Sequence, residues 1–118
     1  MESITEETIT AILNLSLHVC MADGVLSEVE EQSIIEQIKD CFEIVDENAL
    51  RNSIDNFFDS DHPLDGLIAP LVDTVYLKKS LKIAYFAADA DGLDVRENIA
   101  FQRVLRSCNY FLEDIVDV

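Results

Sequence analysis

One short pattern occurs twice along the chain and limits its fold more than any other feature. It combines an Ala-Asp-Gly tripeptide with a Ser or Asp a few residues later and a Glu three residues beyond that. The two copies cover residues 22–30 and 90–97, and their matching positions are Asp23, Gly24, Ser27 and Glu30 in the first and Asp91, Gly92, Asp94 and Glu97 in the second. Glycine readily takes the left-handed backbone that ends a helix, and Ser or Asp followed by Glu at this spacing forms a capping box that starts the next helix. The repeat therefore predicts two helical hairpins, each closed by an Asp-Gly turn.

Apolar residues recur at helical spacing on both sides of each turn. A capping box from Ser3 to Glu6 predicts a helix that runs to about residue 22. This helix and the one over residues 75–89 are apolar on more than one side, so we expect both at the centre of the fold. Residues 28–42 and 95–108 carry one apolar stripe, which is typical of a helix with a solvated face. Shorter helices are expected after a cap at Asp46 and near the C-terminal end, and Pro70 predicts a break in the helical pattern between residues 70 and 74.

No segment alternates between apolar and polar residues as a half-buried strand does, and glycine occurs only three times. The prediction is an all-α fold in which the two hairpins pack as a pseudo-twofold bundle. A chain of 118 residues can enclose one such core and is too short for two, so residues 1–118 are predicted to form a single domain. At its centre we expect four residues to be buried together: Leu13, Leu17, Leu81 and Ala84.

The chain is strongly acidic, with 24 Asp and Glu against 8 Lys and Arg and a formal net charge of −16. Hydrophobic residues make up 49%, which excludes a disordered acidic segment. The overall field repels nucleic acid and anionic membrane surfaces, so neither is expected as a partner. No apolar run approaches the ~20 residues of a membrane-spanning helix, and the acidic N-terminal residues differ from an export signal.

The three cysteines, Cys20, Cys41 and Cys108, are odd in number and far apart. They show no CxxC spacing, so the sequence indicates neither a disulfide framework nor a thiolate zinc site. Each lies in an apolar part of a predicted helix, where the expected role is that of a small buried hydrophobic residue. Reduced thiols are typical of the cytoplasm, where we expect this protein to be found.

The basic residues are unevenly distributed, because six of the eight fall on two consecutive predicted helices. Five of the six are candidates for one patch: Lys78, Lys79, Lys82, Arg103 and Arg106. Gathered on one surface, they would form a basic patch on an acidic body, suited to docking another protein through an anionic surface. The alternative is that they are solvated side chains that only support their helices.

The paired turns resemble those of the TerB-like domain found in bacterial tellurite-resistance and related stress proteins. The shared features are a long helix that ends in Ala-Asp-Gly, a Ser or Asp cap, a following Glu, and the same signature again in the second half of the chain. This resemblance implies an all-α fold of about seven helices and binding of divalent cations by paired acidic residues. It places the metal ligands at Asp23, Glu30, Asp91 and Glu97. The acidic positions are seven apart in the first turn and six apart in the second, so Asp89 is an alternative to Asp91.

The residues themselves agree with a cation site if the two turns meet. Hard cations require several oxygen ligands from more than one segment, and two turns together would supply four carboxylates, which favours calcium or magnesium over zinc. An EF-hand is excluded, because Val19 and Met21 would occupy its first and third ligand positions. The alternative is that Glu30 and Glu97 act only as helix caps.

No nucleophile paired with a base and no glycine-rich phosphate loop is present, so the sequence does not predict an enzyme. The resemblance implies a non-catalytic, metal-binding module of the bacterial stress response or of signalling. Two alternatives remain open. One is a protein-interaction domain whose acidic turns are only structural, and the other is a metal-dependent hydrolase.

Overall fold

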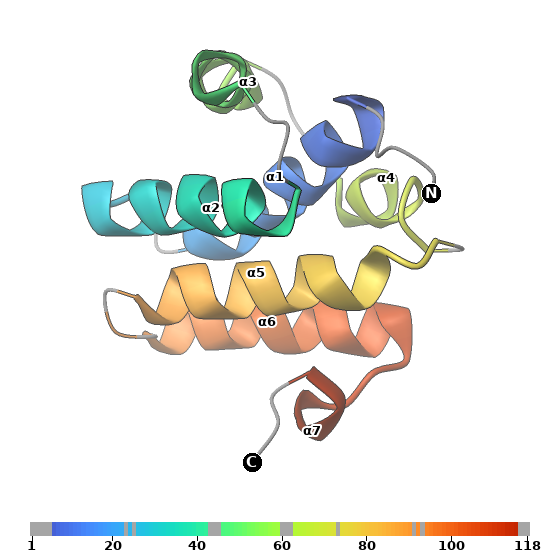
Figure 1. Ribbon diagram of the computed structural model, residues 1–118. Coiled ribbons are helices and arrows are strands. Elements are labelled where there is room, and N and C mark those ends of the chain that lie inside the picture. Colours follow the sequence, from blue (N-terminus) through green and yellow to red (C-terminus); the bar gives the residue numbers. More distant parts are fainter. Residues whose placement is uncertain are drawn as a thin grey trace.

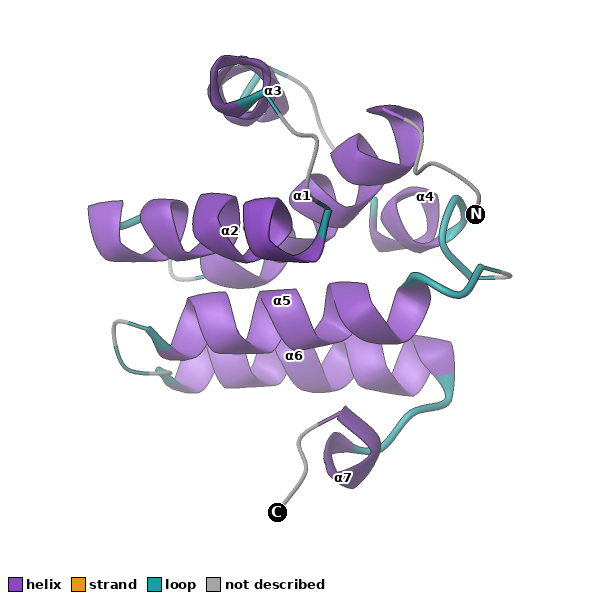
Figure 2. Ribbon diagram, in the orientation of Figure 1, coloured by secondary structure: helices purple, strands orange, loops and turns teal. Residues whose placement is uncertain are grey.

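The computed structural model describes residues 6–22, 24, 26–42, 46–59, 63–72, 74–90, 92 and 94–115. These residues form seven α-helices and no strand, as Figures 1 and 2 show, so the all-α prediction is confirmed. In chain order the helices are α1 (Glu6–Cys20), α2 (Glu28–Cys41), α3 (Glu47–Phe57), α4 (Leu64–Ile68), α5 (Leu77–Asp89), α6 (Val95–Cys108) and α7 (Leu112–Ile115). None of the helices in these ranges is long and apolar enough to cross a membrane.

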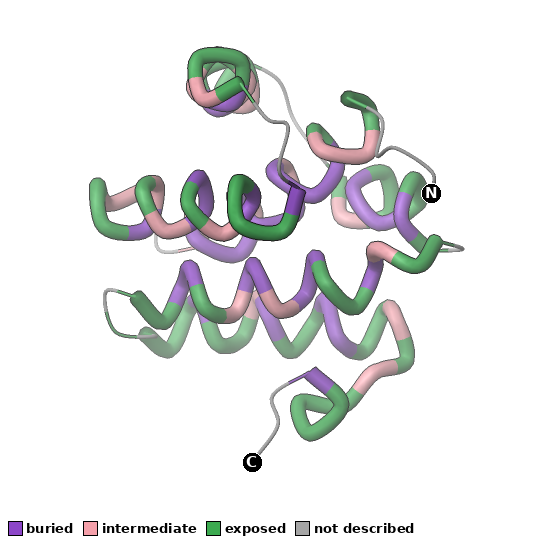
Figure 3. Tube along the Cα trace, viewed as in Figure 1, coloured by how far each residue is buried: buried purple, intermediate pink, exposed green. Residues whose placement is uncertain are grey.

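Helix α1 lies at the centre, because it packs against α2, α3, α4, α5 and α6 and most extensively against α5. Leu13 and Leu17 on α1 and Leu81 and Ala84 on α5 are all fully buried, as predicted. Figure 3 shows buried positions concentrated where α1, α2 and α5 face one another. The only polar residue buried on α1 is Ser16, whose hydroxyl donates to the Ile12 carbonyl and so needs no further partner.

The two hairpins, α1–α2 and α5–α6, pack crosswise. Helix α2 packs more extensively on α5 than on α1, and α6 packs more extensively on α1 than on α5. Figure 1 shows α2 above α5, with α6 running alongside α5 on its far side. Each amphipathic helix therefore covers the apolar helix of the other hairpin, and this arrangement brings the N-terminal ends of α2 and α6 toward the same region of the interior.

The helix ends follow the local sequence signals. Gly24 (φ 90°) and Gly92 (φ 84°) both adopt the left-handed backbone, and their N–H groups donate to the carbonyls of Met21 and Asp89. Asp46 caps α3 by accepting from the backbone N–H of Asn48, whereas Ser3, the expected cap of α1, lies outside the described residues. The break predicted around Pro70 is present, since α4 ends at Ile68 and α5 begins at Leu77.

The prediction that all three cysteines are buried was wrong for Cys41, and one apolar residue of the stripe expected over residues 95–108, Ile99, is also exposed. Cys41 is exposed, because α2 ends there and its buried stripe is formed by Ile34, Ile35 and Ile38. Ile99 on α6 is 48% exposed. It lies two positions from the buried Phe101, which turns its side chain roughly 200° around the helix from the buried face of α6. Cys108 is only half-buried.

Candidate functional site

The capping boxes predicted at the two turns both form. In the first, Ser27 Oγ accepts from the backbone N–H of Glu30 (3.1 Å), and Glu30 Oε1 accepts from the backbone N–H of Ser27 (3.1 Å). In the second, Asp94 Oδ1 accepts from the backbone N–H of Glu97 (2.8 Å), and Glu97 Oε1 accepts from that of Asp94 (3.3 Å). One oxygen of each glutamate is therefore used to start a helix, and the other is left for a different partner.

The two capping glutamates are buried and meet inside the fold. Glu30 is 3% exposed and Glu97 is 2% exposed, although a glutamate in the first turn of a helix ordinarily faces water. One carboxylate oxygen of each and the sulfur of the fully buried Cys20 lie within 4.8 Å of one another. We refer to Cys20, Glu30 and Glu97 as the buried triad.

One atom of the buried triad lacks a partner. Glu97 Oε2 is buried and, among the residues that the structure describes, it is the only buried side-chain nitrogen or oxygen with no hydrogen bond. A buried polar atom left in this state costs about 1–3 kcal/mol. Because ionised carboxylates only accept hydrogen bonds, Glu30 and Glu97 cannot satisfy each other unless a proton or a cation lies between them.

The electrostatics of the buried triad oppose two negative charges. Burial raises the pKa of Glu97 to about 8, assisted by a hydrogen bond with Glu30 and by the repulsion of its charge, while the backbone N–H of Asp94 lowers it. The positive ends of the α2 and α6 dipoles favour anions at this place, but desolvation and repulsion are the larger effects. In the absence of a cation, Glu97 therefore retains its proton near neutral pH and can donate it to Glu30.

The donor atoms fit a divalent metal ion. Zinc binds thiolate sulfur together with carboxylate oxygen in proteins, whereas calcium and magnesium bind oxygen ligands. The carboxylates of Glu30 and Glu97 suit zinc as well as calcium and magnesium, and Cys20 adds the sulfur ligand that zinc prefers. A cation at this place would also give Glu97 Oε2 the partner that it lacks.

The structure brings together only some of the predicted ligands. Glu30 and Glu97 meet, but Asp23 and Asp91 lie outside the described residues. Asp89 is exposed at the last residue of α5 and is not part of the buried triad.

Sequence reasoning missed Cys20 because the absence of a second nearby cysteine excluded a thiolate site. A usable signal existed, since Cys20 continues the stripe of Leu13 and Leu17 on α1 and therefore faces the same interior.

The predicted basic residues are distributed over α5 and α6. Lys78, Lys79, Arg103 and Arg106 are exposed and Lys82 is half-buried. Lys79 Nζ lies 5.7 Å from the centre of the Phe42 ring, which is a cation–π contact. None of the five forms an ion pair within the described ranges of the chain.

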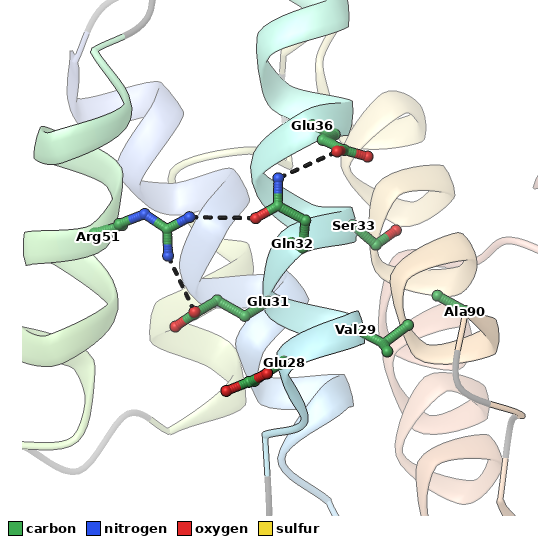
Figure 4. Close-up of a pocket in the computed structure, with 8 residues that line it drawn as sticks. All are labelled: Glu28, Val29, Glu31, Gln32, Ser33, Glu36, Arg51 and Ala90. Atoms are coloured by element: carbon green, nitrogen blue, oxygen red, sulfur yellow. Dashed lines mark hydrogen bonds and ion pairs between the residues drawn. The ribbon is translucent and has the colours of Figure 1, made fainter.

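A large open hollow lies between α2, α3 and the end of α5 (Figure 4). Its volume is about 720 Å³, and its lining is mainly polar. The side chain of Arg51 donates to Glu31 Oε2 and Gln32 Oε1, both at 3.2 Å, and the Gln32 amide donates to Glu36 Oε1 at 3.1 Å. Because these side chains hydrogen-bond to one another, they need a ligand less than the buried triad does, in which Glu97 Oε2 has no partner.

A scan of the sequence against protein-family models found no match, and searches of curated proteins and of solved structures also found none.

Proposed function

We propose that this protein is a TerB-like, non-catalytic module that binds a divalent cation at the buried triad of Cys20, Glu30 and Glu97. The observation that supports this most directly is the unpartnered Oε2 of Glu97, which is buried beside a second carboxylate and a thiol. A cation would replace the proton that the two carboxylates otherwise share, neutralise both of them and give Glu97 Oε2 a partner.

The identity of the ion follows from the donors. The carboxylates alone favour calcium or magnesium, as the sequence predicts, but the sulfur of Cys20 favours zinc or a cation of similar softness. We therefore propose zinc as the preferred ion. Since binding requires Glu97 and Cys20 to release their protons, the affinity should rise with pH.

The TerB-like part of the proposal rests on the paired turns and on the crosswise packing of the two hairpins, which agrees with a pseudo-twofold bundle. Under this proposal, Asp23 and Asp91 would supply further oxygen ligands from the turns. The resemblance further suggests a cytoplasmic role in tellurite resistance, another stress response or signalling. A metal-dependent hydrolase is less favoured, because a catalytic metal keeps a coordination position open to substrate and the triad is buried.

The test is a thermal and urea unfolding titration of the EDTA-treated protein with Zn²⁺, Mn²⁺, Mg²⁺ and Ca²⁺. At a free ion concentration of 100 times Kd, the expected gain in unfolding free energy is about 2.7 kcal/mol. Glu30→Gln should abolish this gain, because it removes one of the two carboxylates that charge the site. All proteins carry Cys41→Ser, since the exposed Cys41 thiol would otherwise bind zinc by itself.

Glu36→Gln is the matched control, because it makes the same change at an exposed position of the same helix and should retain the full gain. A monovalent salt at equal ionic strength measures general screening of the acidic surface. If the divalent ions stabilise wild type no more than this salt does, or stabilise Glu30→Gln equally, Glu30 and Glu97 are only helix caps and the proposal is wrong.

A further inference from the structure

A second hollow lies between the end of α1, the end of α3 and one face of α6. We call it the α1–α6 groove. Its volume is about 460 Å³, and its lining includes Met21, Phe57, Ile99, Arg96, Arg103 and His18. Apart from the two arginines and the histidine, it is lined by apolar side chains, so it can receive an apolar group flanked by negative charge.

The α6 side of the groove is a regular helical face. Arg96, Ile99 and Arg103 follow the spacing i, i+3, i+7, which places the two arginines about 10 Å apart along the helix axis with Ile99 between them. Both arginines are exposed, and neither forms a hydrogen bond or an ion pair with another residue that the structure describes. Two arginines without a carboxylate partner among the described residues are unexpected on a protein with 24 acidic residues, and they favour an anionic partner at this surface.

Helix α7 and the residue before it carry apolar and acidic side chains, which complement the apolar and basic lining of the groove. Phe111 is 73% exposed and Leu112 is 37% exposed, so two large apolar side chains that are adjacent in the sequence both reach the surface. Glu113 and Asp114 follow directly and are exposed. Asp114 accepts from the backbone N–H of Phe111 (3.0 Å), whereas Glu113 makes no contact of this kind among the described residues. The segment thus offers an aromatic and an aliphatic group followed by an available carboxylate.

We propose that the α1–α6 groove of one copy receives Phe111 and Leu112 of a second copy, with Glu113 facing Arg103. The apolar side chains would cover Ile99 and Met21, and the carboxylate would neutralise an arginine. Because the groove of each copy would receive α7 of the other, the two contacts are equivalent and the pair would close as an isologous twofold dimer.

The net charge of the chain favours a second copy over nucleic acid or an anionic bilayer as the occupant of the groove. Nucleic acid or an anionic bilayer would meet the repulsion of the whole acidic chain and would bring no apolar side chain to cover Ile99. The net negative charges of two copies also repel each other. Salt screens most of this repulsion, because it acts over distances longer than the Debye length, which is about 8 Å at physiological ionic strength. The close Glu113–Arg103 pair is screened less, so association should strengthen as monovalent salt rises from low to physiological concentration.

The experiment is sedimentation velocity over a range of protein concentrations at physiological salt. Wild type should shift from monomer to dimer as concentration rises. Arg103→Glu and Glu113→Arg should each raise the dimer dissociation constant by at least about tenfold, because each places like charges opposite each other in both contacts. An equimolar mixture of the two variants should regain wild-type association, since every contact then joins opposite charges.

Arg106→Glu is the control for net charge, as it makes the same change at an exposed position of α6 outside the groove and should leave association unchanged. Far-ultraviolet circular dichroism checks that each variant is folded. A wild type that stays monomeric at every concentration overturns the proposal. A mixture that associates no better than its components also overturns it, even if the groove then binds another partner.

Discussion

Replacing Leu17 by alanine is expected to lower the free energy of unfolding by about 2–5 kcal/mol. Leu17 is fully buried on α1, the helix against which α2 to α6 all pack. Removing its branched end takes apolar atoms out of the core and leaves a cavity. Surrounding helices that pack on one another as well as on α1 cannot readily move to fill it. Urea unfolding followed by circular dichroism measures the loss.

Val75→Ala is the matched control for Leu17→Ala. It also removes aliphatic carbons, but Val75 is 87% exposed, so the change should stay within about 0.5 kcal/mol. If Leu17→Ala costs less than ~1 kcal/mol, α1 does not hold the core together, and its central position carries little of the stability.

The second large effect concerns Glu97 and pH. In EDTA, wild type should lose stability on the order of 4 kcal/mol between pH 5 and pH 8.5, and Glu97→Gln should lose much less. The pKa of Glu97 is about 8 in the folded protein, above its ordinary value of 4.5. Between these values the folded state binds a proton that the unfolded state releases. The stabilisation is therefore fully present below pH 4.5 and is lost as the pH rises through 8.

Glutamine suits this test because its amide oxygen can still accept from the backbone N–H of Asp94, while its NH₂ group can donate to Glu30 as the protonated carboxyl does. Above pH 8, Glu97→Gln should accordingly be more stable than metal-free wild type. Glu36→Gln, at an exposed position, should show the same dependence of unfolding free energy on pH as wild type. Equal slopes in wild type and Glu97→Gln would mean that the buried pair does not hold a proton at neutral pH.

Local signals in the sequence predicted the helices and their ends well. Capping boxes, left-handed glycines and the break near Pro70 depend on residues a few positions apart, and all that fall within the described residues are present. Periodicity also identified α1 and α5 as central, because only a helix surrounded by others can be apolar on several sides. Ile99 is exposed because it lies beside the buried stripe of α6, and Cys41 is exposed because α2 ends there although its spacing continues the stripe of Ile34 and Ile38.

The site was harder to predict than the fold. The spacing of each capping box identified Glu30 and Glu97, but a glutamate at this position ordinarily lies in water, and no local pattern indicates that these two are buried together. That outcome depends on α2 and α6 crossing onto the opposite hairpins, which is a property of tertiary packing. Cys20 joins them for the same reason, from a segment that has no spacing relation to either glutamate.

The crosswise packing also determines when the chain can fold during its synthesis. The buried face of α2 rests on α5, and the Gln37 amide on α2 donates to the Ile83 carbonyl on α5 across 46 positions of sequence. While α1 to α4 leave the ribosome, both α1 and α2 therefore lack their main packing surface. A stable core can form only after α5 has emerged, and until then the apolar sides of α1 remain open to chaperones and to misassociation with other nascent chains.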